Sequence, residues 1–213
     1  MTEELLHSDL EVEYLFATEA FLRDNPSFSS ADIVREVQMQ QMSGQDTPPG
    51  ILAVAHAPSP RPISHKDPLL LALDGIANPG NLGTIIRTAE WFGIRNIVCS
   101  PDCVELWNPK VIQATMGSVF RMNVVYVPLS DFLTEQKQAG KAIFGALLNG
   151  ENLFERKDKT EGILIIGSES HGIRADVFPL ITHPITIPRV GDSPTESLNA
   201  SIAAAIFMAE MTK

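Results

Sequence analysis

The C-terminal two thirds of the chain alternates short apolar runs with segments whose apolar residues recur every three or four positions. Apolar runs of about four to eight residues between turn signals are typical of buried strands, and the second spacing is typical of helices. Strands are expected at residues 69–74, 96–100, 123–127, 141–148, 163–167 and 184–188, and helices at residues 81–92, 108–117, 129–140 and 197–211. This alternation predicts an α/β fold with a mostly parallel sheet and helices on both faces.

The first 67 residues follow a different pattern. Residues 12–18 and 51–55 read as strands, and residues 29–43 read as a helix that begins at a serine. Residues 56–68 contain four prolines, a composition typical of an extended connector. The sequence therefore predicts a small N-terminal module, residues 1–67, followed by a larger domain, residues 68–213.

The charge of the chain limits the partners that it can hold. The net charge is −10, and residues 1–67 alone carry 4 basic and 11 acidic side chains. Binding of nucleic acid depends on clustered Lys and Arg, so any such binding must use a local patch. The acidic N-terminus and the lack of an apolar run near 18 residues favour a cytoplasmic protein with no membrane partner. The two cysteines, Cys99 and Cys103, cannot supply a four-ligand zinc site, so no metal is expected.

Three of the apolar strands are followed by polar turns that contain glycine. These turns cover residues 77–90, 167–173 and 189–201, after strands that end near Asp74, Ile166 and Ile187. Ligands of open parallel sheets bind at the carboxyl ends of the strands. The three turns therefore predict one pocket at that edge of the sheet, although the G-x-G-x-x-G spacing of a dinucleotide site is absent.

Each turn holds candidate functional side chains, and each candidate also has a purely structural interpretation. Asn81 could cap the helix that follows it, and Arg87 could be a solvated helix cation. A serine cap would explain Ser197, but Asn199 is less easily explained because asparagine is not favoured inside a helix. Glu169 is the central carboxylate of the second turn, where it could also bind backbone N–H groups.

The second turn also suggests a hydrolase. "GSESHG" is close to the G-x-S-x-G nucleophile elbow, with Ser170 as the nucleophile and Ser168 in place of the first glycine. Asp176 and His183 are the nearest downstream residues that could complete a triad. The departure at Ser168 counts against this reading, because both glycines relieve crowding in the strained elbow.

The three turns together resemble one family. "NPGNLGTIIRTAEWFG", "LIIGSESHGI" and "ITIPRVGDSPTESLNASIAAAI" resemble, in order, the three motifs of the SpoU branch of the SPOUT superfamily, and "NPKVIQATMGSVFRMNVV" resembles the segment between the first two. The resemblance covers about residues 69–211. Three ordered motifs are far more specific than any one alone.

The resemblance implies a fold, a cofactor and a set of site residues. The fold would carry a C-terminal deep trefoil knot, an exception to the usual unknotted topology, and the protein would be a homodimer. S-adenosylmethionine would lie in the knotted crevice against Leu147, Gly167, Ile187 and Leu198. The catalytic side chains would be Asn81, Arg87, Glu169, Ser197 and Asn199, all of which are present.

The implied activity is transfer of a methyl group from S-adenosylmethionine to a ribose 2′-hydroxyl of RNA. Ribosomal RNA is the expected substrate, and transfer RNA is the alternative. An RNA-binding relative without turnover and a serine hydrolase built on Ser170 are the competing classes. Residues 1–67 resemble only the second half of the ribosomal-protein-like α/β domain that docks RNA in some relatives, so a truncated docking segment is expected.

Overall fold

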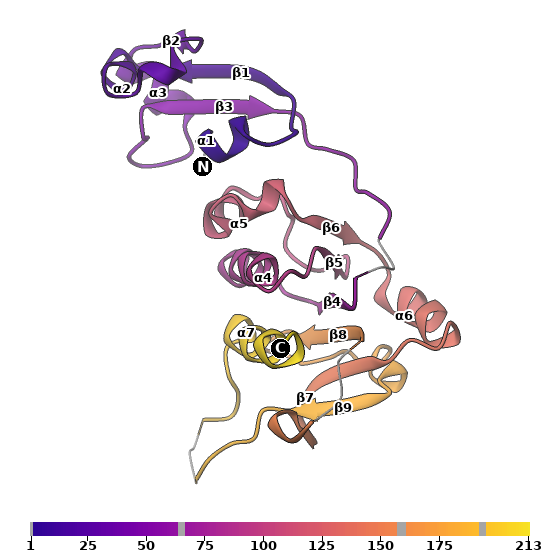
Figure 1. Cartoon of the computed structure of the whole chain (residues 1–213). Coiled ribbons are helices and arrows are strands. Elements are labelled where there is room, and N and C mark those ends of the chain that lie inside the picture. The colour runs from indigo at the N-terminus through magenta and orange to yellow at the C-terminus, as the bar shows by residue number, and fades with distance from the viewer. Residues whose placement is uncertain (1, 64–66, 157–160, 192–194) are drawn as a thin grey trace. The chain divides into compact units, whose positions relative to one another are not determined.

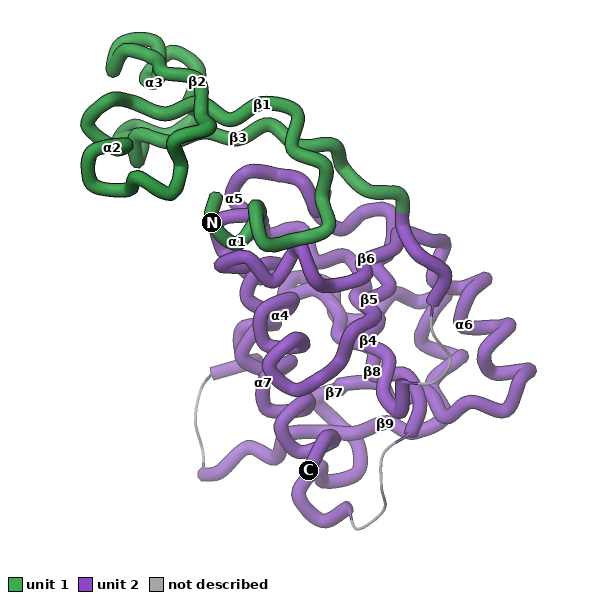
Figure 2. The backbone as a smooth tube through the Cα atoms, turned by 45° about the horizontal axis from the view of Figure 1, so that its top comes forward, with its two compact units in different colours: residues 1–59 green, residues 60–213 purple. Residues whose placement is uncertain are grey.

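The computed structural model describes residues 2–63, 67–156, 161–191 and 195–213. The chain divides into two compact units, residues 1–59 and residues 60–213, which Figure 2 shows in different colours. The larger unit carries all the candidate site residues.

The described part of the larger unit contains a six-stranded sheet in the order β6-β5-β4-β8-β7-β9, and every strand pairing recorded in it is parallel. Its strands are β4 (Leu69–Asp74), β5 (Asn96–Cys99), β6 (Asn123–Tyr126), β7 (Ile143–Asn152), β8 (Gly162–Gly167) and β9 (His183–Thr186). The prediction of a mostly parallel α/β sheet is confirmed. The two central strands β4 and β8 are almost entirely apolar and buried because both faces of the sheet are covered.

Alternate residues of each strand pack into separate cores on the two faces. Leu71 and Leu73 of β4 belong to one buried cluster, and Leu70 and Ala72 belong to the other. The first face is covered by α4 (Pro79–Trp91), α5 (Pro109–Thr115) and α7 (Ala200–Met211), and the second by α6 (Leu129–Gln138), as Figure 1 shows. Short 3₁₀ turns lie between these elements at η2 (Ser118–Phe120), η3 (Leu153–Glu155) and η4 (Phe178–Leu180).

The packing of α4 on α5 depends on a glycine. A Cβ built on Gly83 would collide with the Cβ of Ala114 and lie 2.9 Å from the carbonyl oxygen of Val111. Only a residue without a side chain lets the two helices approach this closely. The contact holds α4 at its place on the sheet.

Strand β7 is interrupted by a bulge. Ile185 of β9 pairs with both Ala146 and Glu151 of β7, so the four residues 147–150 leave the ladder. A Cβ on Gly150 would lie 2.7 Å from the backbone of Pro184, which explains the glycine where the bulged strand returns to β9. A bulge re-aims the residues that it displaces, and here Leu147, Leu148 and Asn149 line a cavity described below.

The described part of the N-terminal unit contains a three-stranded sheet in the order β2-β1-β3. Its elements are α1 (Thr2–Leu6), β1 (Val12–Ala17), α2 (Glu19–Asp24), η1 (Pro26–Phe28), β2 (Asp32–Ile33), α3 (Glu36–Met42) and β3 (Ile51–Ala55). β1 runs parallel to β2 and antiparallel to β3. A small core of Ala17, Ala31 and Ile51 lies under this sheet.

The prediction of one helix over residues 29–43 is wrong in its first half. Asp32 and Ile33 form β2 against β1, and the N–H of Val34 donates to the carbonyl of Ala17 at 2.9 Å. The helix begins only at Glu36, where the Gln38 side chain accepts from the N–H of Arg35 at 3.1 Å. Pairing with a strand from elsewhere in the chain overrides the local helical pattern here.

Candidate active site

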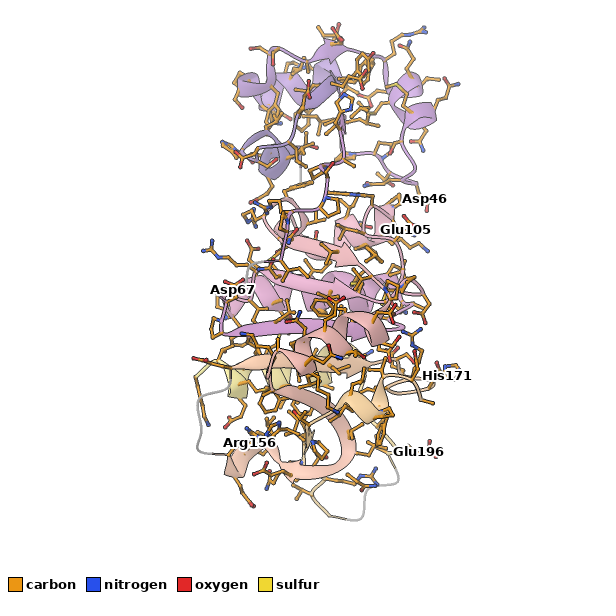
Figure 3. The ribbon with its side chains drawn as sticks, turned by 90° about the vertical axis from the view of Figure 1, so that its right-hand side faces the viewer. Asp46, Asp67, Glu105, Arg156, His171 and Glu196 are labelled. Atoms are coloured by element: carbon orange, nitrogen blue, oxygen red, sulfur yellow. The ribbon has the colours of Figure 1, made fainter. Side chains whose placement is uncertain are left out.

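The candidate residues gather at the edge of the sheet where the strands end. In Figure 3, His171, which follows β8, and Glu196, which precedes α7, lie on one side of the sheet. Asp67, which precedes β4, lies on the opposite side. The prediction that the polar turns meet at one edge agrees with this arrangement. Residues 192–194 of the third turn lie outside the described residues.

Three side chains from the three turns form one hydrogen-bonded cluster, which we call the amide–carboxylate cluster: Asn81, Glu169 and Asn199. Asn81 Nδ2 donates to Glu169 Oε1, and Asn199 Nδ2 donates to the same oxygen at 3.1 Å. Asn199 Nδ2 also donates to Asn81 Oδ1 at 3.1 Å. Because both amides donate to one oxygen, Glu169 acts here as a hydrogen-bond acceptor.

The start of α7 fixes the orientation of Asn199. Its Oδ1 caps the helix by accepting from the N–H groups of Ser201 at 2.9 Å and Ile202 at 3.3 Å. The Ser201 hydroxyl donates to the same Oδ1 at 2.7 Å. With its oxygen committed to the helix, the amide can only point its nitrogen at Glu169 and Asn81. Asn199, rather than Ser197, is therefore the cap of this helix, which begins at Ala200 instead of residue 197.

The start of α4 corrects the structural interpretation of Asn81. The cap is Asn78, whose Oδ1 accepts from the N–H groups of Gly80 at 2.8 Å and Asn81 at 3.1 Å. Pro79 takes the first helical position, where its missing N–H costs nothing. The helix thus begins two residues earlier than expected. This frees the Asn81 side chain, which is nearly buried, to bind Glu169.

Glu169 lies in a tight loop that folds back on itself. Ser168 and Gly172 exchange two backbone hydrogen bonds, of 3.1 and 2.9 Å, and His171 N donates to Ser168 Oγ at 3.2 Å. A Cβ on Gly167 would collide with the backbone of Gly172. The loop therefore needs glycine at residue 167 to close.

A buried ion pair joins the end of this loop to the end of β4. Asp74 is fully buried, and its carboxylate accepts from the backbone N–H of Arg174 at 2.8 Å. Arg174 Nε lies 2.6 Å from Asp74 Oδ1, although the N–H is not aligned for a hydrogen bond, and Nη1 lies 3.3 Å from Asp102 Oδ1. Burial raises the pKa of Asp74, and the contacts with Arg174 oppose that shift. A hydrogen bond with Ser100 lowers the pKa of Asp102.

A cavity of about 1120 Å³ opens beside the amide–carboxylate cluster. Its wall is built from the β7 bulge, the β8 loop, the segment after β9 and the start of α7. The residues expected to hold the cofactor, Leu147, Gly167, Ile187 and Leu198, all line it, as do Glu169 and Ser197. The sequence-predicted residues therefore come together here from four separate parts of the chain.

Arg87 lies outside this lining. It is exposed on α4, six residues after Asn81, and its guanidinium makes no hydrogen bond or ion pair within the described ranges. Asn81 and Asn199 are in contact with Glu169, whereas Arg87 is left free to meet a group from outside this unit.

The hydrolase interpretation lacks its geometry. Ser170 Oγ contacts the Nδ1 of its neighbour His171 at 2.7 Å. His183 begins β9, contacts Thr182 and packs on the ring of Phe144 near the amino ends of the strands. No Ser170–His183–Asp176 relay exists among the described side chains.

The cysteines lie at the carboxyl end of β5, where Cys99 is the last residue of the strand and Cys103 follows in the next loop. Both are free and buried, and the Cys103 Sγ accepts from the N–H of Ile76 at 3.2 Å. A hydrogen bond with Cys99 lowers the pKa of Cys103 to about 7 and raises that of Cys99. Within the described ranges, no three His, Cys, Asp or Glu side chains are grouped as a metal site would require, and no helix is long and apolar enough to cross a membrane.

Sequence reasoning missed Asn78, Ser201 and the Asp74–Arg174 pair. Asn78 carried a readable signal, because asparagine before proline is typical of a helix start. Ser201 carried no such signal, because its role is to donate a hydrogen bond from its hydroxyl to Asn199 Oδ1, a contact that only the structure shows. Asp74 and Arg174 lie 100 residues apart, and only the fold brings them together.

Comparison with known proteins gives a consistent result. The SpoU rRNA Methylase family matches residues 68–209. The chain is 34% identical over 164 residues to the 23S rRNA (guanosine(2553)-2′-O)-methyltransferase RlmP of Bacillus subtilis, covering 76% of this chain and 64% of that protein. It is 27% identical to the 23S rRNA (uridine(2479)-2′-O)-methyltransferase of Streptomyces viridochromogenes, covering 84% and 65%. The chain thus spans less than two thirds of the length of either relative.

The fold is also similar to solved structures. A putative RNA methyltransferase of the TrmH family from Porphyromonas gingivalis superposes with a TM-score of 0.83 at 36% identity, over 98% of this chain and 84% of that one. The SpoU methyltransferase AviRb from Streptomyces viridochromogenes, solved in complex with AdoMet, superposes with a TM-score of 0.81 at 23% identity, over 99% and 86%. At that identity the second likeness concerns the fold alone.

The buried ion pair gives a stability prediction. Arg174→Ala should lower the free energy of unfolding by about 3 kcal/mol, because it leaves the fully buried Asp74 carboxylate with the backbone N–H of residue 174 as its remaining contact with that residue. Arg121→Ala is the matched control, since it breaks an ion pair with Glu90 in which both side chains are partly exposed, and should cost less than about 1 kcal/mol. Urea denaturation measures both. Equal losses in the two variants would contradict the prediction.

Proposed function

The chain belongs to the SpoU rRNA methylase family, and from that premise we propose that it transfers a methyl group from S-adenosylmethionine to a ribose 2′-hydroxyl of RNA. The observation that carries the proposal is the amide–carboxylate cluster at the rim of the cavity. Asn81, Glu169 and Asn199 come from three turns at one sheet edge and present hydrogen-bonding groups beside a space that can hold a nucleoside.

The cavity fits S-adenosylmethionine in size and chemistry. Pockets for small ligands are typically about 300–1,000 Å³, so this one has room for the cofactor together with a reacting ribose. Leu147, Ile187 and Leu198 supply apolar surface for an adenine ring. The N–H of Leu198 has no acceptor within the described ranges, which leaves a backbone donor available to a ligand. These residues and Gly167 would hold the cofactor.

The bound cofactor supplies a methyl group made electrophilic by its sulfonium. The protein's part is to align the 2′-hydroxyl with that methyl group, and good alignment can remove about 7–11 kcal/mol of a barrier. Asn81 and Asn199 hold Glu169 at the cavity rim. Ser197 lines the same cavity just before α7 and shapes its floor.

Arg87 is the residue that we expect to contact the RNA most directly. A guanidinium stays protonated and can bind phosphate through two parallel N–H groups. The Arg87 side chain is exposed and makes no hydrogen bond or ion pair within the described ranges, so its guanidinium is available to bind a phosphate. We assign it the grip on an RNA phosphate beside the target ribose, or stabilisation of the charge that develops on the 2′-oxygen.

Ribosomal RNA is the proposed substrate, which would place the protein in the cytoplasm with ribosomes. Two relatives described above are named for methylation of 23S rRNA. We propose that residues 1–67 are a segment that docks RNA and residues 68–213 the methyltransferase domain. The segment is acidic, so it would dock RNA weakly through phosphates. Transfer RNA remains the alternative substrate.

We also propose a homodimer with a C-terminal trefoil knot, as the family resemblance implies. The helices α4 and α7 lie side by side on one face of the sheet (Figure 1). They expose two large apolar side chains, Trp91 at 85% and Ile202 at 51%. Phe207, which the apolar pattern of the last helix also offers to a partner, is instead buried in its own unit. Exposed apolar surface of this kind is typical of an interface.

Cofactor binding is the first test of the function. S-adenosylmethionine should bind without RNA, because the cavity is built within this chain. Isothermal titration calorimetry should show heat, and mapping of ribose methylation in RNA from cells with and without the gene should show one lost site, in ribosomal RNA. Absence of both signals would remove the methyltransferase reading, and a lost site in transfer RNA would change only the substrate.

Substitution of Arg87 separates catalysis from cofactor binding. Arg87→Ala should slow single-turnover methyl transfer by about 10²–10³-fold, because one preorganised charge contact of the transition state is lost. Arg87→Lys should fail nearly as badly, since a point charge cannot reproduce the two-pronged grip. Cofactor affinity should not change in either variant. The control is Arg95→Ala, which removes an exposed arginine just before the amino end of β5, away from the carboxyl ends of the strands. Equal rates of methyl transfer in the Arg87 and Arg95 variants would refute the assignment.

The dimer has its own test. Light scattering should give about twice 23.3 kDa. Ile202→Asp places a charge in the proposed interface and should give monomers, whereas Phe178→Asp, at an exposed residue of η4, should not. A monomeric wild-type protein at micromolar concentration would exclude the proposal.

A further inference from the structure

We propose that Glu169 is the catalytic base that accepts the proton of the ribose 2′-hydroxyl. This inference rests on the proposed methyl transfer and deepens it, because it names the atom of this chain that receives the proton. The observation behind it is that Glu169 Oε1 accepts hydrogen bonds from two amides, while Oε2 has no hydrogen-bond partner among the described residues.

The other side chains of the site are unsuited to the role. Arg87 stays protonated in any protein, so it has no lone pair to accept a proton. Asn81 and Asn199 carry amides, and Ser197 carries a neutral hydroxyl, none of which is basic near neutral pH. His171 and Glu196 also line the cavity, but of these three side chains Glu169 is the one that the amides of Asn81 and Asn199 contact. Carboxylates are common general bases.

The hydrogen-bond directions keep Glu169 in the form that a base needs. Asn199 Oδ1 is held by three donors at the start of α7, so its nitrogen must face Glu169. Asn81 Oδ1 accepts from Asn199, so its own nitrogen also faces Glu169. Both amides therefore donate to Oε1, and neither can accept a proton from Glu169. Toward both amides, Glu169 therefore acts as a hydrogen-bond acceptor.

The second oxygen of Glu169 is accessible. Oε2 makes no hydrogen bond within the described ranges, and Glu169 is exposed and lines the cavity. An acceptor site therefore remains on the side of the carboxylate away from the amides. A ribose hydroxyl entering the cavity can donate its hydrogen bond there.

The proton transfer balances with the methyl transfer. As the 2′-oxygen forms its bond to the methyl carbon, its proton moves to Glu169 Oε2 and the electron pair of the breaking carbon–sulfur bond stays on sulfur. The products are a 2′-methoxy ribose, a neutral thioether and a protonated Glu169. The exposed carboxyl then returns its proton to water, so no further reactant is required.

Glu169→Gln tests the base separately from the structural role. A glutamine oxygen can still accept from Asn81 and Asn199, but its amide nitrogen places donors where Oε2 had lone pairs. We expect single-turnover methyl transfer to fall at least about 100-fold, within the range for a lost general base. S-adenosylmethionine affinity and the melting temperature should stay close to wild type. The control is Asp176→Asn, which makes the same carboxylate-to-amide change at another exposed residue, seven positions further along the chain. It should leave the rate of methyl transfer unchanged.

Glu169→Asp serves as the second variant. It retains a carboxylate that is one methylene short, so its rate should lie between those of the wild type and Glu169→Gln. The proposal is overturned if Glu169→Gln transfers methyl within about threefold of wild type, if its loss is fully explained by lost cofactor binding, or if Glu169→Asp is no faster than Glu169→Gln. Failure of the wild-type protein to methylate RNA would instead refute the proposed function.

Discussion

One carboxylate holds the three functional turns together. Glu169, at the tip of the loop after β8, accepts hydrogen bonds from Asn81 in the first turn of α4 and from Asn199 at the cap of α7. Both helices therefore point their N-termini toward the same negative charge, which the partial positive charge of a helix N-terminus stabilises. Among the described residues no backbone ladder joins the three turns, and this cluster is a side-chain contact that all three share.

The cluster can be this specific because the surrounding backbone leaves it little freedom. Gly83 lets α4 pack closely on α5, and Gly167 lets the β8 loop close on itself. The Asp74–Arg174 pair joins that loop to the end of β4 in the protein interior. A buried ion pair gives little net stability, but loss of one partner is costly, which makes such a pair a strict determinant of geometry.

The amide–carboxylate cluster and Arg87 differ in how many contacts hold them in place and in the task that we propose for each. Asn81, Glu169 and Asn199 are connected to one another and to helix caps, as suits groups that must align a small reacting atom. Arg87 extends from the exposed face of α4 without a partner in the described part of the chain. In a chain with a net charge of −10, such free cations are the places where an RNA backbone can be attracted.

The sequence by itself determined the larger unit to a considerable degree. The short apolar runs at residues 69–74 and 163–167 predicted buried strands, and they form β4 and β8, whose side chains alternate between two covered faces. The three motifs identified the family and the residues that line the cavity. These features are local, so a short stretch of chain carries the whole signal.

Tertiary structure decided the rest, because the deciding contacts join residues far apart in the chain. Asn81 and Glu169 are separated by 88 residues, and Asp74 and Arg174 by 100. The β7 bulge depends on its pairing with β9, and β2 replaces part of an expected helix because β1 offers it a partner. The periodicity of a segment predicts that the segment is buried. The folded chain alone determines which other segment packs on it and which polar atoms come into contact.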